Sequence, residues 1–330
     1  MPSSLYQTLS DAALSRVFEK TLHTEVRSSS LMTGGLFNTT YRAETADFGT
    51  VVLRVEPVNR HLLMPFEHRL MEAETRVYAL CRERGIPVSE VLACDTTKTV
   101  LDRDFMMVRC LDAKPLSAFS LTEDDRARLS YDVGRACAAM HGITHPRFGR
   151  IVEREDRAGK DGFARWSDFL YDELLSWETV ARGADKCLFS EEEHEEFRRL
   201  FRAAAPVLDE IQTPCLVHTD LWFGNVLAYD RGGKPEFAAV IDADRALWGD
   251  PEFEFSSIRW MHGEARFWDG YGKPLADDKN SVIRRAVYHI LNRLWNAYVY
   301  LWEYNMPDEM AGERELARGE AAFLGEIFPI

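Results

Sequence analysis

The sequence pattern of the 330-residue chain changes near residue 111 from strand-like segments to mostly helical ones, and this change limits the folds that the chain can adopt. Before that point, short segments rich in β-branched residues predict strands at 39–44 and 50–55, joined by a turn at 46–49. The segment DFMMVRCL (104–111) predicts a buried strand. A helix with one apolar face is expected at 68–84, and a polar amphipathic helix at 10–23. Residues 1–111 are therefore predicted to form a small sheet with one main helix.

Beyond residue 112 the pattern becomes mostly helical. Helices are expected at 123–141, 165–182, 190–211, 281–305 and 308–324. One β island, 215–244, lies between them. The sequence thus predicts an α+β protein with two lobes, 1–111 and 112–330, and with a helical subdomain mainly at 155–211 and 256–330.

Composition excludes several classes of protein. A formal charge of −14 argues against a nucleic-acid binder, which normally carries a basic patch. The most apolar long stretch, 286–306, contains polar and charged residues and is a poor membrane span. The six cysteines are scattered and include no CxxC pair, which fits reduced thiols. The N-terminal residues do not show the basic and then apolar pattern of a signal peptide. We therefore expect a soluble cytoplasmic protein without membrane or nucleic-acid partners.

The stretch LVHTDLWFGNVL (216–227) places a polar centre inside an apolar frame. Its polar members are His218, Asp220 and Asn225. A buried carboxylate without a partner costs free energy, so it is either satisfied by the protein or used in chemistry. A carboxylate of this kind can orient or deprotonate a hydroxyl.

A second stretch, VIDADRALWGDPEFEF (240–255), follows an apolar strand. Asp242 comes directly after that strand, and Asp244 two residues later. Asp220, Asn225 and Asp242 offer oxygen ligands on one small β island, which is the kind of set that holds Mg²⁺ beside phosphates. Asp250 before Pro251 is interpreted as a helix N-cap.

Three features of the first lobe could serve an anionic ligand. Arg54 lies in the apolar strand VVLRV, where an inward side chain needs an anionic partner, although alternation alone leaves an outward one equally open. Glu74 sits in the middle of the apolar face of helix 68–84 and needs a cation. Gly34 and Gly35 allow the backbone to approach a phosphate, but most such turns are only structural.

His141 and His145 end a helix with a spacing that could suggest a metal, but no carboxylate follows, and a surface loop is the preferred interpretation.

The order of these parts resembles that of protein-kinase-like phosphotransferases. The spacing from Asp220 to Asn225 in HTDLWFGN equals that of the kinase loop H-R-D-L-x-x-x-N. DFG and APE motifs and an activation loop are missing. Instead, HTDLWFGNVL and VIDADRALWGDPEFEF are similar to segments of the aminoglycoside/antibiotic phosphotransferase family, and the resemblance covers about residues 30–275. It implies a bilobal protein-kinase-like fold, with nucleotide in the first lobe and catalysis and substrate in the second.

The resemblance implies roles for the residues of the β island. Asp220 would act on the acceptor hydroxyl, and His218 would brace the loop. Asn225 and Asp242 would bind Mg²⁺, and Asp244 is a further possible ligand.

The resemblance also implies a site for ATP or GTP. Arg54, standing where kinases usually have lysine, would reach the phosphates and be held by Glu74. The glycine turn would cover the phosphates, and the strand that ends at 111 would take the base. The implied nucleotide-binding residues are Gly34, Gly35, Asn38, Arg54, Glu74, Met107 (or Met106 beside it), Arg109 and Leu111.

The acceptor site is implied to lie among the helices of the second lobe. In helix 281–305, Tyr288, Leu291, Trp295, Tyr298 and Trp302 recur at helical spacing, and a core stripe is the preferred interpretation. Seven acidic residues could form a pocket for a cationic molecule, or lie on ordinary solvated helix faces. They are Asp168, Asp172, Glu173, Glu178, Glu252, Glu254 and Asp269.

The predicted function is therefore an ATP- or GTP-dependent O-phosphotransferase that acts on a hydroxyl of a small molecule, with an antibiotic preferred as acceptor. The alternative within the fold is a metabolic kinase for choline, homoserine or a fructosamine, because the Asp-Leu-Trp and Gly-Asn elements of HTDLWFGN also resemble fructosamine kinases. A metal-dependent hydrolase and a nucleotide-binding pseudokinase are the other hypotheses. The sequence says nothing about the oligomeric state.

Overall fold

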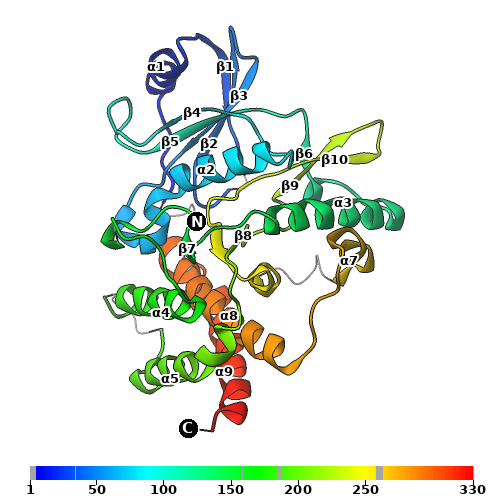
Figure 1. Ribbon diagram of the computed structural model, residues 1–330. Helices are drawn as coiled ribbons and strands as arrows, with labels where there is room; N and C mark the ends of the chain where they lie inside the picture. The colour runs from blue at the N-terminus through cyan, green and yellow to red at the C-terminus, as the bar shows by residue number, and fades with distance from the viewer. Residues whose placement is uncertain (1–4, 34, 158, 184–187, 258–262, 330) are drawn as a thin grey trace.

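The structure, a computed structural model, describes residues 5–33, 35–157, 159–183, 188–257 and 263–329. A sheet of five strands forms the upper lobe in Figure 1, in the order β1-β2-β3-β5-β4. Its neighbouring strands are antiparallel. The strands are β1 (Val26–Leu31), β2 (Thr39–Thr45), β3 (Thr50–Val55), β4 (Val91–Asp95) and β5 (Phe105–Arg109). The expected strands at 39–44, 50–55 and 104–111 are confirmed, whereas β1 and β4 were not predicted.

Alternation along β3 and β5 gives the sheet two buried faces. Leu53 lies opposite Met107 and Arg54 opposite Met106 in the ladder. Leu53 and Met107 pack in the core with helix α1 (Asp11–Leu22), while Met106 packs in the core with α2 (Leu70–Glu83). The side chain of Arg54 therefore points to the α2 side, where Glu74 is fully buried.

The lower lobe is mostly helical (Figure 1). Its main helices are α3 (Glu123–His141), α4 (Trp166–Gly183), α5 (Glu191–Leu208), α7 (Ala265–Tyr271), α8 (Lys279–Tyr298) and α9 (Pro307–Ile327), and the short helix α6 (Glu254–Ser257) precedes α7. These bounds confirm the predicted helices 123–141, 165–182 and 190–211 to within a few residues. The predicted helix 281–305 ends earlier, because α8 passes into a π-helical turn, η7 (Val299–Glu303).

Small strands lie within the predicted β island, 215–244, and pair with others from outside it. Together these strands are β6 (Lys114–Pro115), β7 (Gly149–Arg150), β8 (Cys215–Val217), β9 (Val226–Asp230), β10 (Pro235–Val240) and β11 (Leu247–Gly249). β6 and β10 both pair with β9, and β7 and β8 both pair with β11. Apolar residues of β8, β9 and β10 share one core with Met71, Met106 and residues of α3. The segments between these strands are thus held against the first lobe.

Helices α3 and α7 approach each other closely at two glycines. A Cβ added at Gly134 would lie 2.2 Å from the carbonyl oxygen of Phe267, and one at Gly270 would lie 2.0 Å from that of Tyr131. Backbone groups cannot move aside as a flexible side chain can, so only glycine fits. This contact positions α7, which carries Tyr271 toward His141.

Replacing Gly134 with alanine should therefore lower the free energy of unfolding by about 1–3 kcal/mol, because the added methyl group overpacks the helix crossing. Thermal unfolding measures the effect. Gly312→Ala is the matched control, since Gly312 lies within α9 with nothing near its Cβ position, and it should stabilise slightly. Equal midpoints for wild type and Gly134→Ala would contradict the packing argument.

The apolar stripe of α8 is confirmed as core. Tyr288 and Leu291 have no exposed surface, and Trp295 and Tyr298 keep less than a tenth. Within the described residues, no helix combines the length and the low polarity that crossing a lipid bilayer requires.

Candidate active site

The polar residues of the β island meet where three strands begin or end. Asp220 follows β8, Asn225 directly precedes β9, and Asp242 follows β10. Because Val226 of β9 pairs with Val240 of β10, the two polar segments that extend from these strands run side by side. The ladder continues into them, since the Ile241 N–H donates to the Asn225 carbonyl at 2.9 Å.

The segment that carries Asp220 is fixed from behind by Glu254. Its carboxylate accepts hydrogen bonds from the backbone N–H of His218 at 2.7 Å and of Thr219 at 3.1 Å. Thr219 has a φ of 72°, a conformation that costs free energy in a residue other than glycine. Two charge-assisted hydrogen bonds offset this cost and hold the turn that presents Asp220. No sequence pattern indicated this role for Glu254.

His218 occupies the bracing position that was predicted for it. Its Nε2 lies 3.0 Å from the carbonyl oxygen of Ile241, and its Nδ1 accepts from the Asp220 N–H at 3.3 Å. A ring that donates at Nε2 and accepts at Nδ1 is neutral. Burial lowers the pKa of His218, which agrees with this neutral form. The ring therefore joins the two polar segments and is not free to exchange a proton with a ligand.

His141 is not on a surface loop, so that expectation was wrong. The ring is buried, and its Nδ1 lies 2.7 Å from the Tyr271 hydroxyl. Its Nε2 lies 3.5 Å from the Glu254 carboxylate and 3.7 Å from the Cys137 thiol. The three groups form a buried cluster behind the segment that carries Asp220. His141 thus completes the support of Glu254.

Asn225 and Asp220 contact each other directly. The Asn225 amide nitrogen donates to the Asp220 backbone carbonyl and to its Oδ2, both at 2.8 Å. Because the amide nitrogen is used in this way, the Asn225 oxygen Oδ1 is turned away and is left for another ligand.

The Asp220 carboxyl is shifted toward proton acceptance near neutral pH. Burial and the charge of Asp242 raise its pKa to about 7, while Arg245 and the hydrogen bond from Asn225 act in the opposite direction. A general base is most effective when its pKa lies near the working pH. The environment of Asp220 thus suits the removal of a proton from a hydroxyl group.

Arg54 lies at the centre of three carboxylates. It pairs with Glu74 and with Asp242, and its Nη2 lies 3.3 Å from Asp244. Glu74 in turn accepts the Asp242 N–H at 3.2 Å. The pairing of Arg54 with Glu74 follows the expectation from the sequence.

Three carboxylates around one guanidinium leave an excess of negative charge. Ligand atoms of Glu74, Asp242 and Asp244 lie within 4.8 Å of one another. Asp242 is the most open of the three, with 37% of its side chain exposed. Carboxylate and amide oxygens are the ligands that Mg²⁺ prefers, so the donor chemistry here, with the Asn225 oxygen nearby, fits that ion. The structure leaves Asp244 as a further candidate, buried against Arg54.

The glycine turn is described only in part. Gly34 lies outside the described residues, and Gly35 is exposed between β1 and β2. Asn38 is buried at the start of β2, and its Oδ1 has no hydrogen-bond partner among the described residues. The ring of Phe37 lies 5.6 Å from the Arg245 guanidinium, so the β1–β2 hairpin lies beside Arg245.

The residues predicted to hold the base lie on different faces of the sheet. Met107 points into the core with α1, on the sheet face opposite Arg54, so its side chain does not meet the other predicted residues. Met106 lies on the Arg54 side. The backbone N–H of Arg109 donates to the backbone carbonyl of Glu90, and that of Cys110 donates to the backbone carbonyl of Thr50. Leu111 and the backbone carbonyls of residues 109–111 are left as the possible contacts for a base.

A buried group of charges connects the two lobes beside this site. Arg245 donates to Glu67 at 2.6 Å, and Glu67 also accepts the Met64 N–H at 2.8 Å. Glu303, at the end of the π-helical turn, has no exposed surface and lies within range of the charge of Glu67. Two adjacent carboxyls cannot both ionise at low cost, because their negative charges repel each other. Burial and the charge of Glu67 raise the pKa of Glu303 well above its usual range.

This arrangement predicts a pH-dependent stability. Glu303 binds its proton more tightly in the folded than in the unfolded protein, so the stabilising effect of this proton is complete below the unfolded pKa of about 4.3 and is lost as pH rises toward the folded pKa. Glu303→Gln keeps a hydrogen-bond donor and cannot ionise, so its unfolding midpoint should fall less between pH 5 and 8 than that of the wild type. Glu315→Gln, at an exposed site, should follow the wild type. Parallel curves for all three proteins would contradict a neutral Glu303.

The seven acidic residues that could have formed a cationic pocket are engaged elsewhere. Six of them pair with arginine, and Glu254 holds the backbone as described above. The pairs are Asp168 with Arg165, Asp172 and Glu173 with Arg154, Glu178 with Arg182, Glu252 with Arg285, and Asp269 with Arg266. Their charges are thus largely neutralised within the protein.

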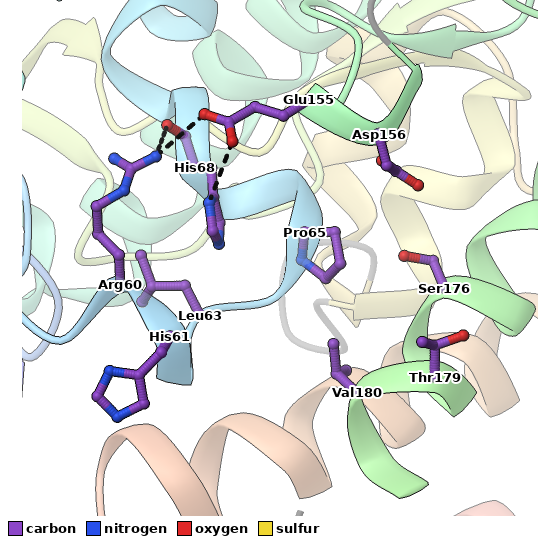
Figure 2. Close-up of a pocket in the computed structure, with 10 residues that line it drawn as sticks. All are labelled: Arg60, His61, Leu63, Pro65, His68, Glu155, Asp156, Ser176, Thr179 and Val180. Carbon is purple, nitrogen blue, oxygen red and sulfur yellow. Dashed lines mark hydrogen bonds and ion pairs between the residues drawn. The ribbon is translucent and has the colours of Figure 1, made fainter. Parts of the chain in front are cut away.

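A separate cavity has a volume of about 450 Å³, and Figure 2 shows the residues that line it. It lies between the segment 60–68 of the first lobe, the short segment at 155–156, and the C-terminal half of α4. Glu155 bridges Arg60 and His68 on one wall, and Ser176 and Val180 form the other. None of the residues predicted for the site lines this cavity.

Comparisons with known proteins agree with this geometry. The sequence model of the phosphotransferase enzyme family matches residues 30–288. The chain is 27% identical over 185 residues to the chloroplastic protein-ribulosamine 3-kinase of Arabidopsis thaliana, a match that spans 53% of this chain and only 51% of the relative. It is 24% identical over 232 residues to the probable ketoamine kinase of Vibrio cholerae, covering 67% of this chain and 72% of the relative.

Solved structures resemble the whole chain. A ternary complex of aminoglycoside phosphotransferase APH(4)-Ia with AMP-PNP and hygromycin B has a TM-score of 0.65 at 16% identity, covering 94% of this chain and 98% of the other. The GDP and kanamycin complex of APH(2")-IIia has a TM-score of 0.61 at 12% identity, with 95% and 99% covered. Similarity at this level of identity shows the fold, and the predicted bilobal protein-kinase-like fold is confirmed.

Proposed function

This chain is a member of the phosphotransferase enzyme family, and from that membership and the site geometry we propose that it moves the γ-phosphate of ATP or GTP to a hydroxyl of a small molecule. The predicted enzyme class, a small-molecule kinase, agrees with the kinases among its relatives. The observation that carries the proposal is the meeting of Asp220 and Asn225 with Asp242 beside Arg54.

Each of these residues has a definable task in phosphoryl transfer. Asp220, with its raised pKa, accepts the proton of the attacking hydroxyl. Asn225 and Asp242 would hold Mg²⁺, which when bound supplies positive charge beside the phosphates. Arg54, held by Glu74, offers its guanidinium to the phosphate oxygens.

The remaining nucleotide contacts are proposals that rest on position. Gly35 and Asn38 lie in the hairpin above Arg54, and Gly34 is proposed with them from the sequence alone. The backbone at Arg109–Leu111 follows β5 and would meet the base, with Met106 in place of Met107 beside it. His218 keeps its supporting role.

For the acceptor we favour a ketoamine, a sugar joined to an amine. Two curated relatives carry that chemistry in their names, and the HTDLWFGN motif resembles fructosamine kinases. An antibiotic is the second candidate, because VIDADRALWGDPEFEF is similar to the antibiotic group. The solved antibiotic kinases are too distant in sequence to choose between the two.

A panel experiment tests this proposal. The protein is incubated with Mg²⁺, ATP or GTP, and fructosyl-lysine, ribulosyl-lysine, kanamycin, hygromycin B, choline or homoserine, and the products are read by mass spectrometry. We expect fructosyl-lysine or ribulosyl-lysine to gain one phosphoryl group. Phosphorylation of kanamycin or hygromycin B alone would move the assignment to an antibiotic kinase. Nucleotide binding without transfer to any compound would favour the pseudokinase hypothesis.

A further inference from the structure

The end of helix α8 departs from α-helical geometry beside the active site. The turn η7 (Val299–Glu303) is π-helical, and the Tyr304 N–H donates to the Val299 carbonyl, five residues back, at 3.1 Å. A π turn holds one more residue than an α turn, so the side chains that follow are rotated by about 100° from the direction that a continuous α-helix would give them. Such turns are frequent at functional sites.

The π turn separates two sets of aromatic residues. Tyr288, Trp295 and Tyr298 lie in the core on the regular part of α8. Tyr300 and Tyr304, in and just after the turn, are only half-buried, and their ring centroids lie 6.3 Å apart. The two rings therefore form a neighbouring pair outside the core stripe.

The π turn begins next to Tyr298, whose hydroxyl contacts the first lobe at the Leu62 carbonyl, and both rings that follow lie within range of active-site charges. Burial, followed by the charges of Glu313 and Glu309, raises the pKa of Tyr300, and the charge of Asp220 contributes in the same direction. Tyr304 interacts with the charges of Arg245, Glu303, Glu67 and Asp242. One hydroxyl is thus within electrostatic range of the proposed base, and the other within range of the proposed metal ligand.

The two hydroxyls also differ from those of nearby tyrosines. Tyr298 donates to the Leu62 carbonyl at 3.1 Å, and Tyr288 donates to Asp250 at 2.7 Å. In the described part of the chain, no hydrogen bond is made by the hydroxyl of Tyr300 or of Tyr304. A tyrosine hydroxyl on a half-buried ring, without a protein partner, is available to a ligand.

We propose that Tyr300 and Tyr304 bind the acceptor, donating hydrogen bonds to its non-reacting hydroxyl groups while the reacting hydroxyl faces Asp220. This assignment rests on the proposed phosphotransferase function and adds the residues that orient the acceptor. The half-buried rings offer an apolar surface for a sugar, and the hydroxyls fix its register. The acceptor is therefore polyhydroxylated, with at least two hydroxyls near the one that is phosphorylated.

The test compares Tyr300→Phe and Tyr304→Phe with the wild type, using fructosyl-lysine and kanamycin as probes. Losing one neutral hydrogen bond should lower kcat/KM for the acceptor by about three- to tenfold in each variant, with the KM for nucleotide unchanged. Tyr298→Phe is the matched control, because its hydroxyl is engaged by the first lobe. It should lower the unfolding midpoint and leave kcat/KM for the acceptor unchanged.

The possible results separate two failures. Transfer by the wild type, with kcat/KM within twofold of it in both variants, would overturn the tyrosine assignment alone. The same would follow if the KM for nucleotide rose as much as the KM for acceptor, because the residues would then act on the whole site. No transfer to either probe by the wild type would overturn the proposed function and the tyrosine assignment with it.

Discussion

Asp220→Asn is expected to lower the rate of phosphoryl transfer by about 10²–10⁴-fold, the usual contribution of a positioned general base. Asparagine has nearly the same shape, and its oxygen can still accept the hydrogen bond that Asn225 donates to the Asp220 side chain. It cannot take up a proton from the acceptor hydroxyl. The measurements are steady-state transfer to the acceptor found in the panel and nucleotide affinity by calorimetry, and affinity should stay within a few-fold of the wild type.

The control for this variant is Asp230→Asn. Asp230 lies at the far end of strand β9 from Asn225, is exposed, and contacts Lys114 and the Gly233 backbone. The variant should keep wild-type activity. Activity in Asp220→Asn close to that of the wild type would remove Asp220 from the reaction. A loss of nucleotide binding would mean that the substitution disturbs the neighbouring site.

Asp242→Asn is expected to abolish the dependence of nucleotide binding on Mg²⁺. Altering a residue that only supports a metal ligand costs roughly 10–100-fold in metal affinity, so the loss of a charged ligand should cost more. The variant also loses one of the three carboxylates around Arg54, which weakens the hold on that side chain. Calorimetric titration of ATP at several Mg²⁺ concentrations measures the effect.

Asp244→Asn is the matched comparison for Asp242. Asp244 is buried and lies 3.3 Å from Arg54, so it is placed to neutralise that cation more than to meet solvent or ligand. We expect a smaller change in the Mg²⁺ requirement than for Asp242→Asn. Equal losses in the two variants would make Asp244 a ligand as well. Mg²⁺-dependent binding that persists in Asp242→Asn would contradict the assignment of the metal site.

The sequence predicted the long periodic elements well, and the structure brings the motif residues close to one another. Helices α3, α4 and α5 have clear apolar periods, and Asp220, Asn225 and Asp242 stand in segments whose spacing is informative by itself. Strand β1, with the sequence VRSSSL, was not predicted because it is mostly exposed and its polar and apolar residues do not alternate.

Other features depend on contacts that sequence spacing does not contain. Met106 and Met107 are adjacent apolar residues in a strand buried on both faces, so no polar side fixed which of them points toward Arg54. Glu254 looked like one more acid on a helix, but it holds the backbone of the catalytic segment. Tyr300 was hidden because a π turn cannot be read from the residues that form it.

The most direct test of the site is a crystal structure of the protein with AMP-PNP and Mn²⁺, in which anomalous scattering locates the metal. We expect a peak in contact with the Asn225 oxygen and an Asp242 carboxylate oxygen, at a distance close to the roughly 2.0–2.1 Å typical of Mg²⁺ ligands, with Arg54 turned to the phosphates. A peak at the buried Cys137, His141 and Glu254 cluster instead, or nucleotide bound away from the β1–β2 hairpin, would contradict this expectation.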